Sequence, residues 1–505
     1  MDVVLGIDTG TTATKAVTAG PGGEVRARAG VHYPLSVPAP GRAELDPGAL
    51  GAAAVRALTD VARQARDRGD RVVAVSLSAF LHGLVAMDAG GRPLGPLITW
   101  ADGRAAAQCD AIAAAGHARE LQARTGTPVH PMSPLAKLAW WRDTQPATLH
   151  DTPRWGGAKE TVLGVLAGGP ALVDLSIASG TGLYDIHRRR WDPTALEIAG
   201  VRAGQLAEVV ATTHRLTLRP DVAAAAGLPP ATPLIVGAAD GPLANLGAGA
   251  TAPGAAAVSL GTSGAIRTAV RAPAVDRAGR LFCYALTEDR WVIGGAVNNA
   301  GSVVRWAGQA LTGRPGEQMP TDADLRDAAL LAEAGGVPAG SDGLICLPYL
   351  LGERAPWWRS GLRGAYLGLR REHGRGHLVR AAVEGVCQQL ALVRDTCTDE
   401  GVTITEVRAT GGALASPVWA SVLAATLDLP VAVADTAGGT ALGACLLGWY
   451  ALGALPDLDR AAELVGTAEP TRPDPDAAAL YRRRRPLVER AAFAVTDLLS
   501  ELDRP

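Results

Sequence analysis

The sequence has no excess of charge of either sign, no paired cysteine motif and no long apolar run. Its 505 residues carry 48 Lys and Arg against 50 Asp and Glu, which leaves a formal net charge of −2. This balance provides no overall electrostatic attraction to nucleic acid or to an anionic membrane surface. We therefore expect neither of them as a partner.

The six cysteines are scattered along the chain and form no Cys-x-x-Cys pair. Their spacing argues against a zinc site or a disulfide framework and favours a reducing, cytoplasmic location. The N-terminus has no basic region ahead of an apolar one, so no signal peptide is predicted. The apolar stretch 441–455 is short, rich in glycine and followed by Pro456, which is typical of a buried helix rather than a membrane span.

What is present is a chain long enough for two or three domains. Hydrophobic residues make up 48% and charged residues 19%, as in ordinary globular proteins. Short strand-like runs alternate with helical stretches throughout, which indicates an α/β fold. The basic run Arg482–Arg485 is interpreted as the solvated face of a C-terminal helix.

An apolar run at 234–236 breaks at small residues, presents one carboxylate at Asp240 and continues as residues that can open a helix. An acid at a strand-to-helix turn can serve as a general base, so Asp240 is the candidate catalytic residue. The alternative is an Asp that caps the helix N-terminus.

Two glycine–threonine turns, each between two predicted strands, occur early in the two halves of the chain. They are the stretches 8–12, with Gly10, Thr11 and Thr12, and 261–265. Backbone N–H groups and hydroxyls in such turns can hold phosphate oxygens, and Asp8 can hold Mg²⁺ through water. A plain hairpin is the alternative for each turn. Their separation by about half the chain suggests two related domains that face each other, an arrangement suited to phosphoryl transfer.

Three further loops carry candidate binding residues. His82 and Gly83 follow a predicted strand at 72–77, and a second loop carries Trp100, Asp102 and Arg104. Polar and aromatic side chains in connecting loops are often specificity residues. Alternatively, His82 is a turn histidine and Asp102 caps the helix that follows.

The third loop, with Gly411 and Gly412, lies between a predicted strand at 406–408 and a predicted helix at 417–427. A turn of this kind permits the close approach of a flat or phosphate-bearing ligand.

The sequence resembles the FGGY family of carbohydrate kinases, within the actin-like ATPase superfamily, over nearly its whole length. The stretch 364–369, a spacer and the stretch 377–384 fit the C-terminal signature of the family at every defined position. The N-terminal signature fits at Met132, Pro134, Lys137 and Trp140, and departs from the usual residue types at Trp141 and Thr144.

Within the family the likeness is greatest to the gluconokinase branch. It is carried by the stretches 261–267, 279–286, 291–299 and 351–358. Relatives of that branch usually have Asp or Asn where this chain has Arg359, and often Gln where it has Ser421.

The resemblance implies two ribonuclease-H-like domains around a central cleft, here divided as residues 1–245 and 246–505. It implies ATP and Mg²⁺ as cofactors, Asp240 as the base and Asp8 at the metal. The remaining roles carry over by motif. Thr11, Thr12 and Lys15 match the first phosphate loop, Gly261 and Thr262 match the second, and Gly411 and Gly412 match the adenosine loop. The residues that match the sugar contacts are His82, Gly83, Trp100, Asp102 and Arg104.

The resemblance thus implies an ATP-dependent kinase that converts D-gluconate to 6-phospho-D-gluconate, with a small sugar or sugar acid as its partner and a homodimer allowed. The substrate carboxylate requires a cation or several N–H donors, and Arg104 and Arg354 are the candidates. Each can instead form a structural ion pair, Arg104 with Asp102 or Arg354 with Glu353.

Three alternatives remain open. One is a kinase for xylulose or another pentulose or polyol, and another is a non-metabolic actin-like ATPase that uses its cleft as a switch. The third, a sugar-binding regulator with a decayed site, is disfavoured because Asp8, Thr11, Asp240 and Thr262 are all present.

Overall fold

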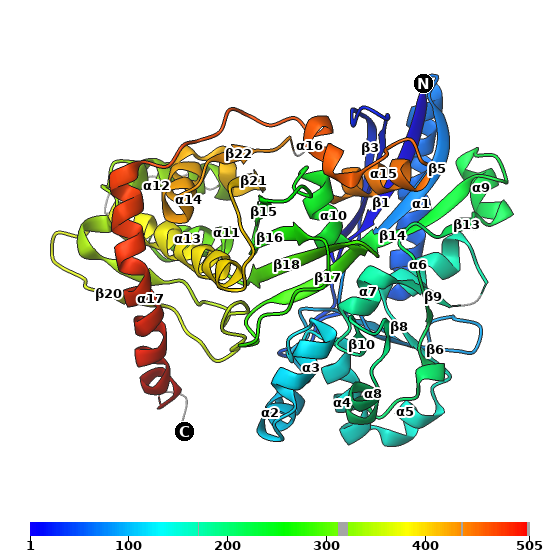
Figure 1. The fold of residues 1–505 in the computed structure, drawn as a ribbon, viewed down its shortest axis with the longest axis horizontal. Helices are drawn as coiled ribbons and strands as arrows, with labels where there is room; N and C mark the ends of the chain where they lie inside the picture. Colours follow the sequence, from blue (N-terminus) through cyan, green and yellow to red (C-terminus); the bar gives the residue numbers. More distant parts are fainter. Residues whose placement is uncertain (170, 312–321, 436–437, 502–505) are drawn as a thin grey trace. The chain divides into compact units, whose positions relative to one another are not determined.

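The computed structural model describes residues 1–169, 171–311, 322–435 and 438–501. The chain forms two compact units, each of which draws on more than one stretch of sequence (Figure 1). Unit 1 comprises Met1–Ala252, Ala269–Ile293 and Thr436–Gly466, and unit 2 comprises Pro253–Thr268, Gly294–Asp435 and Thr467–Pro505. The single boundary after residue 245 that the sequence suggests stays a prediction.

Unit 1 is built on a six-stranded sheet in the order β13-β14-β5-β1-β2-β3. Strands β1, β5 and β14 run parallel, and β1, β2 and β3 form an antiparallel meander. The strands are β1 (Asp2–Thr9), β2 (Ala13–Ala19), β3 (Val25–His32), β5 (Arg71–Ala79), β13 (Arg215–Thr217) and β14 (Pro233–Ala239). The strands predicted on the two sides of the first glycine–threonine turn are confirmed as β1 and β2, and the strand predicted at 72–77 is confirmed as β5.

Two long helices pack against this sheet. Helix α1 (Pro47–Asp67) begins at the N-cap Asp46, whose side chain accepts a hydrogen bond from the Gly48 N–H, and it contacts β1, β2 and β3. Helix α15 (Gly439–Ala451) contacts β1, β2 and β5 and is buried along most of its length. The central strands are buried because apolar residues fill the space between the sheet and these helices. The interpretation of 441–455 as a buried helix is confirmed.

Helix α10 (Asp240–Gly247) follows directly after β14, as the sequence predicts. It packs closely on α15, because glycines on both helices let the backbones approach. A Cβ atom at Gly443 would lie 2.0 Å from the Leu243 carbonyl oxygen, and one at Gly247 would lie 2.3 Å from that of Gly439. The backbone that carries Asp240 is therefore held between the sheet and a buried helix.

Shorter elements complete unit 1. Small two-stranded sheets pair β4 with β7, β6 with β8, β9 with β12 and β10 with β11. Their strands are β4 (Glu44–Leu45), β6 (Val85–Met87), β7 (Leu97–Ile98), β8 (Arg154–Gly156), β9 (Leu172–Asp174), β10 (Tyr184–Asp185), β11 (Arg190–Trp191) and β12 (Glu208–Val210). The helices are α2 (Ala106–Ala114), α3 (Ala118–Thr125), α4 (Pro134–Thr144), α5 (Pro146–Asp151), α6 (Ala158–Leu166), α7 (Leu175–Ser179), α8 (Pro193–Ala199), α9 (Pro220–Ala226) and α16 (Ala461–Leu464).

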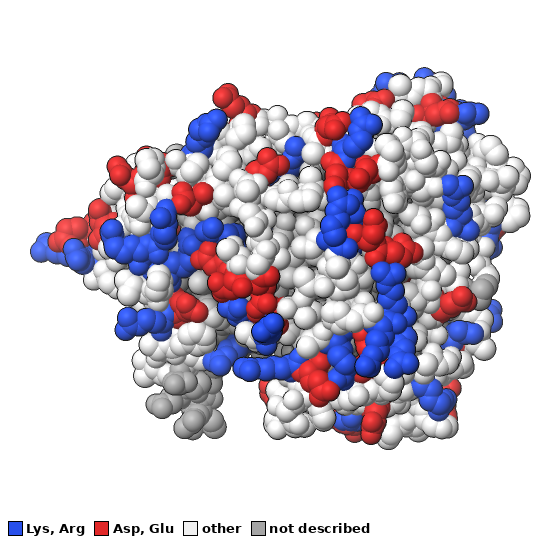
Figure 2. Space-filling view, in the orientation of Figure 1, with Lys and Arg blue, Asp and Glu red and all other residues white. Residues whose placement is uncertain are grey.

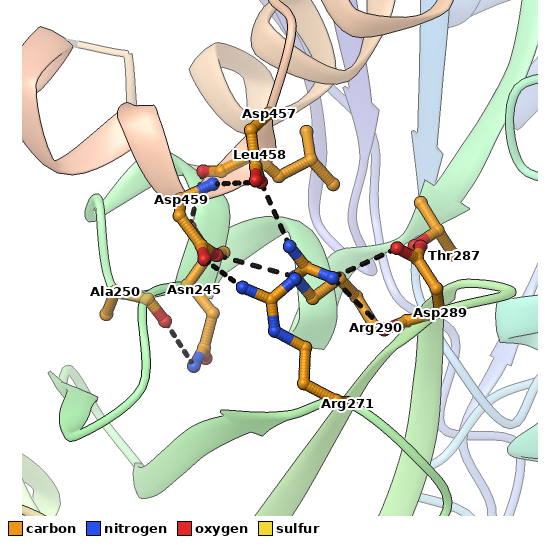
Figure 3. Close-up of polar contacts among 10 residues, drawn as sticks. Asn245, Ala250, Arg271, Thr287, Asp289, Arg290, Asp457, Leu458 and Asp459 are labelled. Carbon is orange, nitrogen blue, oxygen red and sulfur yellow. Dashed lines mark hydrogen bonds and ion pairs between the residues drawn. The ribbon is translucent and has the colours of Figure 1, made fainter.

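An ion-pair cluster joins the separate stretches of unit 1 (Figure 3). The Arg290 guanidinium lies 2.9 Å from an Asp457 carboxylate oxygen, 3.4 Å from one of Asp459 and 3.0 Å from one of Asp289. Arg271 also pairs with Asp459. Because the Arg290 side chain is only 5% exposed, its three carboxylate partners offset the cost of burying its charge. These pairs link residues about 170 positions apart in the chain.

The second six-stranded sheet has the order β17-β18-β16-β15-β21-β22. Its strands are β15 (Ala255–Leu260), β16 (Gly264–Val270), β17 (Phe282–Thr287), β18 (Arg290–Val297), β21 (Glu406–Thr410) and β22 (Val431–Val433). Both sheets share one plan: a first strand with an antiparallel hairpin partner on one side and parallel strands on the other. The likeness between the two halves that the turns suggest therefore extends to strand order.

Unit 2 contains a buried 25-residue helix, α13 (Arg375–Asp399), which contacts α11, α12, α14 and α17. Those helices are α11 (Gly301–Ala310), α12 (Ala323–Gly335), α14 (Pro417–Leu427) and α17 (Pro475–Glu501), and a small sheet pairs β19 (Ile345–Leu347) with β20 (Ala365–Leu367). The predicted helix at 417–427 is confirmed.

The interpretation of Arg482–Arg485 as a solvated face is wrong for the last residue of the run. Arg485 is 7% exposed and donates to a Gln388 side-chain oxygen at 3.1 Å and an Asp395 carboxylate oxygen at 2.7 Å. Arg482 is exposed, as expected. Helix α17 turns one arginine in four toward α13, and local sequence does not reveal which one.

Charges of both signs are interleaved over the face shown in Figure 2. No helix among the described residues is both long and apolar enough to cross a membrane.

Candidate active site

Parallel strands bring the acidic candidates of unit 1 to one edge of its sheet. Strands β1, β5 and β14 are neighbours, so their carboxyl ends lie side by side. Asp8 pairs in register with Ser78, and Ala239, which precedes Asp240, pairs with Ala79. Ligands of sheets with this connectivity bind beyond the carboxyl ends of the strands.

Asp240 is the first residue of α10, and the N-cap position is held by Ala239. A carboxylate oxygen of Asp240 accepts a hydrogen bond of 2.8 Å from the N–H of Gly241. The side chain is half-buried at the positive end of the helix dipole, which stabilises a carboxylate. A carboxylate at this location can accept a proton and stays partly accessible to a ligand.

Asp8 lies at the end of β1, where its carboxylate accepts a hydrogen bond of 2.8 Å from the Ser78 hydroxyl. Burial raises the pKa of Asp8, and the Ser78 hydrogen bond and the positive charges of Lys15 and Lys159 oppose that shift. A cation bound beside this carboxylate would therefore relieve a desolvation cost.

The Gly10–Thr12 turn joins β1 to β2 and is held in place by two hydrogen bonds from Tyr33, just after the end of β3. The Tyr33 hydroxyl donates to the Gly10 carbonyl at 2.6 Å, and the Tyr33 N–H donates to the Thr12 carbonyl at 3.1 Å. Burial raises the pKa of Tyr33 to about 12, so its hydroxyl keeps its proton. The Thr12 and Lys15 side chains remain exposed, available to an anionic ligand.

His82 is a non-glycine residue with a left-handed backbone, at φ 68°. Its Nδ1 lies 2.8 Å from the Gly180 carbonyl oxygen, and its own carbonyl accepts a hydrogen bond of 2.6 Å from the Lys137 ammonium. Burial lowers the pKa of Lys137 to about 7. A strained residue held this firmly is typical of a functional site. Next to it, a Cβ atom at Gly83 would lie 3.2 Å from the Ala158 nitrogen.

Arg104 forms a buried ion-pair network rather than an open cationic site. Its Nε and Nη2 atoms each lie 2.7 Å from an Asp102 carboxylate oxygen, Nη2 also pairs with Glu44, and the guanidinium lies over the Trp140 ring. Burial would raise the pKa of Asp102, but hydrogen bonds from Arg104 and the Ala43 N–H hold it below its ordinary value. The structural ion pair of Arg104 with Asp102, which the sequence allowed as an alternative, is therefore present.

The two candidate turns of unit 2 also lie at one sheet edge, because β15 and β21 are parallel neighbours with Ser259 opposite Thr410. Gly261 and Thr262 are exposed, and their carbonyls accept hydrogen bonds from the first turn of α11. Gly411 has φ 117°, and a Cβ atom there would lie 2.1 Å from the Leu260 carbonyl oxygen. This position therefore requires glycine.

Two of the stretches that resemble gluconokinases meet at the buried Glu353. Its carboxylate accepts hydrogen bonds from the Asn298 N–H, the Asn299 side-chain amide at 3.1 Å and the Arg354 N–H at 2.9 Å. Burial raises the pKa of Glu353 to about 7, although these three hydrogen bonds act to lower it. The Arg354 guanidinium donates to the Val297 carbonyl at 3.1 Å.

Comparison with known proteins identifies the family. Residues 3–247 match the N-terminal domain model, and residues 256–452 the C-terminal domain model, of the FGGY family of carbohydrate kinases. The chain belongs to the FGGY family of carbohydrate kinases. The predicted family is confirmed.

Individual relatives cover almost the whole FGGY kinase chain. The gluconokinase of Bacillus subtilis (strain 168) is 38% identical over 488 residues, 96% of this chain and 94% of the relative. The structure of gluconate kinase from Lactobacillus acidophilus has a TM-score of 0.92 at 31% identity and covers 99% of this chain and 100% of that one. Ligand-bound xylulose kinase from the same organism also has a TM-score of 0.92, at 30% identity, with 100% of both chains covered. The predicted two-domain α/β fold class is confirmed.

Sequence reasoning missed several residues that support the candidate site of this FGGY kinase. They contact the motifs through folding: Ser78, Lys159, Asp174, Ser176 and Tyr284. Ser78 stands just before the His82 loop and Tyr284 within the stretch 279–286, whereas no local signal marks Lys159, Asp174 or Ser176.

Proposed function

We propose that this FGGY kinase transfers the γ-phosphoryl group of ATP to the terminal hydroxyl of D-gluconate. The observation that carries the choice of gluconate is the 38% identity to a gluconokinase over 96% of the chain. Backbone likeness does not separate the sugars, since a gluconate kinase and a xylulose kinase have equal TM-scores. Xylulose is therefore the second candidate substrate.

Asp240 acts as the base in this proposal. Its carboxylate accepts the proton of the sugar hydroxyl as the oxygen attacks phosphorus, and the bond to the leaving ADP oxygen breaks. Support comes from its half-buried place at the start of α10 and at the carboxyl edge of the sheet. There the helix dipole keeps the carboxylate ionised until it takes up the proton.

The chemistry of the donor set at Asp8 fits Mg²⁺ through water. The described residues contain no cluster of three or more His, Cys, Asp or Glu side chains that could hold a metal ion. One carboxylate is nevertheless a suitable partner for an ion that keeps most of its water and binds substrate phosphates. When bound, Mg²⁺ would neutralise charge on the phosphate oxygens. Asp8, oriented by Ser78, would hold one of its waters.

The glycine–threonine turns supply the phosphate contacts in this proposal. Backbone N–H groups and hydroxyls of Thr11, Thr12 and Thr262, with Gly261 and the Lys15 ammonium, bind phosphate oxygens. Gly411 and Gly412 admit the adenosine. These roles are supported by the exposure of Lys15, Gly261 and Thr262, and by the finding that no described atom lies within 4 Å of a Cβ atom at Gly412.

On the sugar side, His82, Gly83 and Trp100 would contact the substrate, and the Asp102–Arg104 pair would hold their loop in place. Since Arg104 is engaged with two carboxylates, Arg354 is the better remaining candidate for the gluconate carboxylate. The six buried cysteines and the use of ATP favour a cytoplasmic enzyme.

A coupled ADP-release assay with gluconate, sorbitol, xylulose, ribulose, glycerol and erythritol tests the proposal. We expect gluconate to have the highest kcat/KM, at least tenfold above its uncharged analogue sorbitol, because a charge-assisted contact contributes roughly 1.5–3 kcal/mol. A preference for xylulose would contradict the gluconate assignment. Rapid ATP turnover that does not depend on sugar would instead favour an actin-like switch.

A further inference from the structure

Lysine is scarce in this chain, which contains only Lys15, Lys137 and Lys159. Two of the three, Lys137 and Lys159, are fully buried, with no exposed surface. Burying an ammonium group is costly unless its N–H bonds and its charge are matched. In a chain that otherwise uses arginine, both positions therefore call for a compact cation with three donors rather than a planar guanidinium.

The Lys159 ammonium lies against an irregularity at the end of β14. The register of β14 with β5 shifts between Ile235 and Ala238. Gly237, inside this bulge, has φ 77°, and a Cβ atom there would lie 1.8 Å from the Leu77 carbonyl oxygen. The bulge ends two residues before Asp240, so its geometry decides the direction in which α10 starts.

Three carbonyl groups at this bulge point to Lys159. Its Nζ donates to the carbonyl oxygens of Leu77 at 2.9 Å, Val236 at 2.8 Å and Ala238 at 3.1 Å. The three N–H bonds of the ammonium are thus matched by three carbonyl oxygens at the irregular strand pairing. The ammonium thus ties the ends of β5 and β14 together at the point where the chain turns toward Asp240.

Asp174 balances the charge and adds a second tie. Its Oδ2 lies 3.2 Å from the Lys159 Nζ, and its Oδ1 accepts hydrogen bonds from the Ser176 and Ile177 N–H groups. The Ser176 hydroxyl donates to Asp174 and accepts a hydrogen bond of 2.6 Å from the N–H of Ala239. Residues on both sides of Gly237 are therefore anchored, up to the residue that precedes Asp240.

We infer that Lys159, with Asp174 and Ser176, is a positioning device that aims the Asp240 carboxylate at the reacting hydroxyl, an inference that rests on the proposed function. Burial lowers the pKa of Lys159, and the charges of Asp174, Glu160 and Asp240 oppose that shift. Lys159 touches no reacting atom in this account and acts through the backbone of β14.

Lys137 provides the matched control, because it is equally buried and also donates to carbonyls. Its partners are His82 at 2.6 Å and Met132 at 2.7 Å, on the sugar side. We expect K159M to lower kcat and K137M chiefly to raise KM for the sugar. Misplacing a catalytic base by about 1 Å lowers the reaction rate roughly 100-fold. We therefore expect kcat of K159M to fall roughly 10–100-fold, while its KM for ATP stays within about threefold of the wild-type value.

K159M alone leaves the Asp174 carboxylate buried without its cation and can fail to fold, so K159M/D174N, which removes both charges, is measured beside it. S176A provides a milder variant, with S179A on the same helix as its control. We expect K159M/D174N to keep the kcat loss while folded, S176A to lose roughly 3–10-fold in kcat, and S179A to stay within about twofold.

A folded K159M/D174N with kcat within twofold of wild type, together with a fully active S176A, would overturn the inference. So would an equal kcat loss in K137M and K159M, because it would indicate general damage to unit 1. D240N tests the proposed base separately from the role of Lys159. If D240N keeps its kcat, Asp240 is not the base, regardless of the results with the Lys159 variants.

Discussion

The Nε2 atom of His82 lies 3.5 Å from the hydroxyl oxygen of Tyr284, although 202 positions separate the two residues in the chain. Since the Nδ1 atom of His82 faces the Gly180 carbonyl oxygen, which can only accept, Nδ1 carries the proton of the neutral ring. Nε2 is then an acceptor, and the Tyr284 hydroxyl can donate to it. Tyr284 is held in turn by its parallel stack with Phe282, at 4.4 Å between ring centroids.

Y284F should therefore loosen the His82 ring without changing the fold. We expect KM for the sugar to rise roughly 2–10-fold, the effect of one neutral hydrogen bond, while KM for ATP stays unchanged. Steady-state kinetics with each substrate varied in turn measures this split. An equal rise in both KM values would mean that Tyr284 has no particular role at the sugar side.

D240N tests the base most directly, because the amide keeps the size of the carboxylate and removes its ability to accept a proton. We expect kcat to fall roughly 10²–10⁴-fold while ATP binding survives, as measured by isothermal titration. A variant with near-normal kcat would mean that Asp240 serves only to begin α10.

G261V and T262V test the second phosphate turn. Among the described residues, a Cβ atom at Gly261 would meet only the Ser263 carbonyl oxygen, at 3.8 Å, so these residues accommodate the substitution and a loss of activity reports on the ligand. We expect roughly 100-fold lower kcat/KM for ATP in G261V and roughly tenfold in T262V. Unchanged ATP kinetics in both variants would reduce the turn to a hairpin. Gly411 is unsuitable for this test, since any side chain there clashes with the Leu260 carbonyl.

R104Q should act on stability more than on substrate choice. It would leave the buried Asp102 carboxylate without its main partner, a change that costs roughly 3–5 kcal/mol for a buried pair. R92Q, which breaks the exposed pair with Asp88, should cost no more than about 0.5 kcal/mol. Urea unfolding of the two variants measures the difference. If R104Q instead kept wild-type stability and had a weaker preference for gluconate over sorbitol, Arg104 would be the residue that binds the substrate carboxylate.

Glu160 should make stability depend on pH. Burial raises its pKa to about 7 from an ordinary 4.5, so between these values the folded protein binds more protons than the unfolded chain. Stability should therefore fall as pH rises from about 4.5 to about 7, by at most about 3 kcal/mol from this group. E160Q should narrow the difference in melting temperature between pH 5 and pH 8, and the exposed-site variant E197Q should not. If wild type, E160Q and E197Q all showed the same difference in melting temperature between the two pH values, Glu160 would not be the source of the pH dependence.

Local sequence was sufficient to predict the elements that carry the candidate site. The strand–turn–strand segments around Gly10 and Gly261, the passage from β14 into α10 and the helix at 417–427 follow from apolar runs, glycine turns and caps, which act over a few residues. The family signatures then pointed to carbohydrate kinases, and the comparisons bear this out. The catalytic roles of the individual residues stay predictions.

Relations between distant segments could not be read from the sequence, because they depend on which strands become neighbours and which side chains are buried there. The sequence offered the Arg104–Asp102 pair as an alternative, but the second carboxylate partner of Arg104, Glu44, lies 60 positions away and reaches it only through folding. Lys159 has no distinguishing context in the chain, yet it meets carbonyls from two strands about 80 positions away. A buried charge must find partners wherever packing brings them, and those partners are set by the assembled sheet rather than by neighbours along the chain.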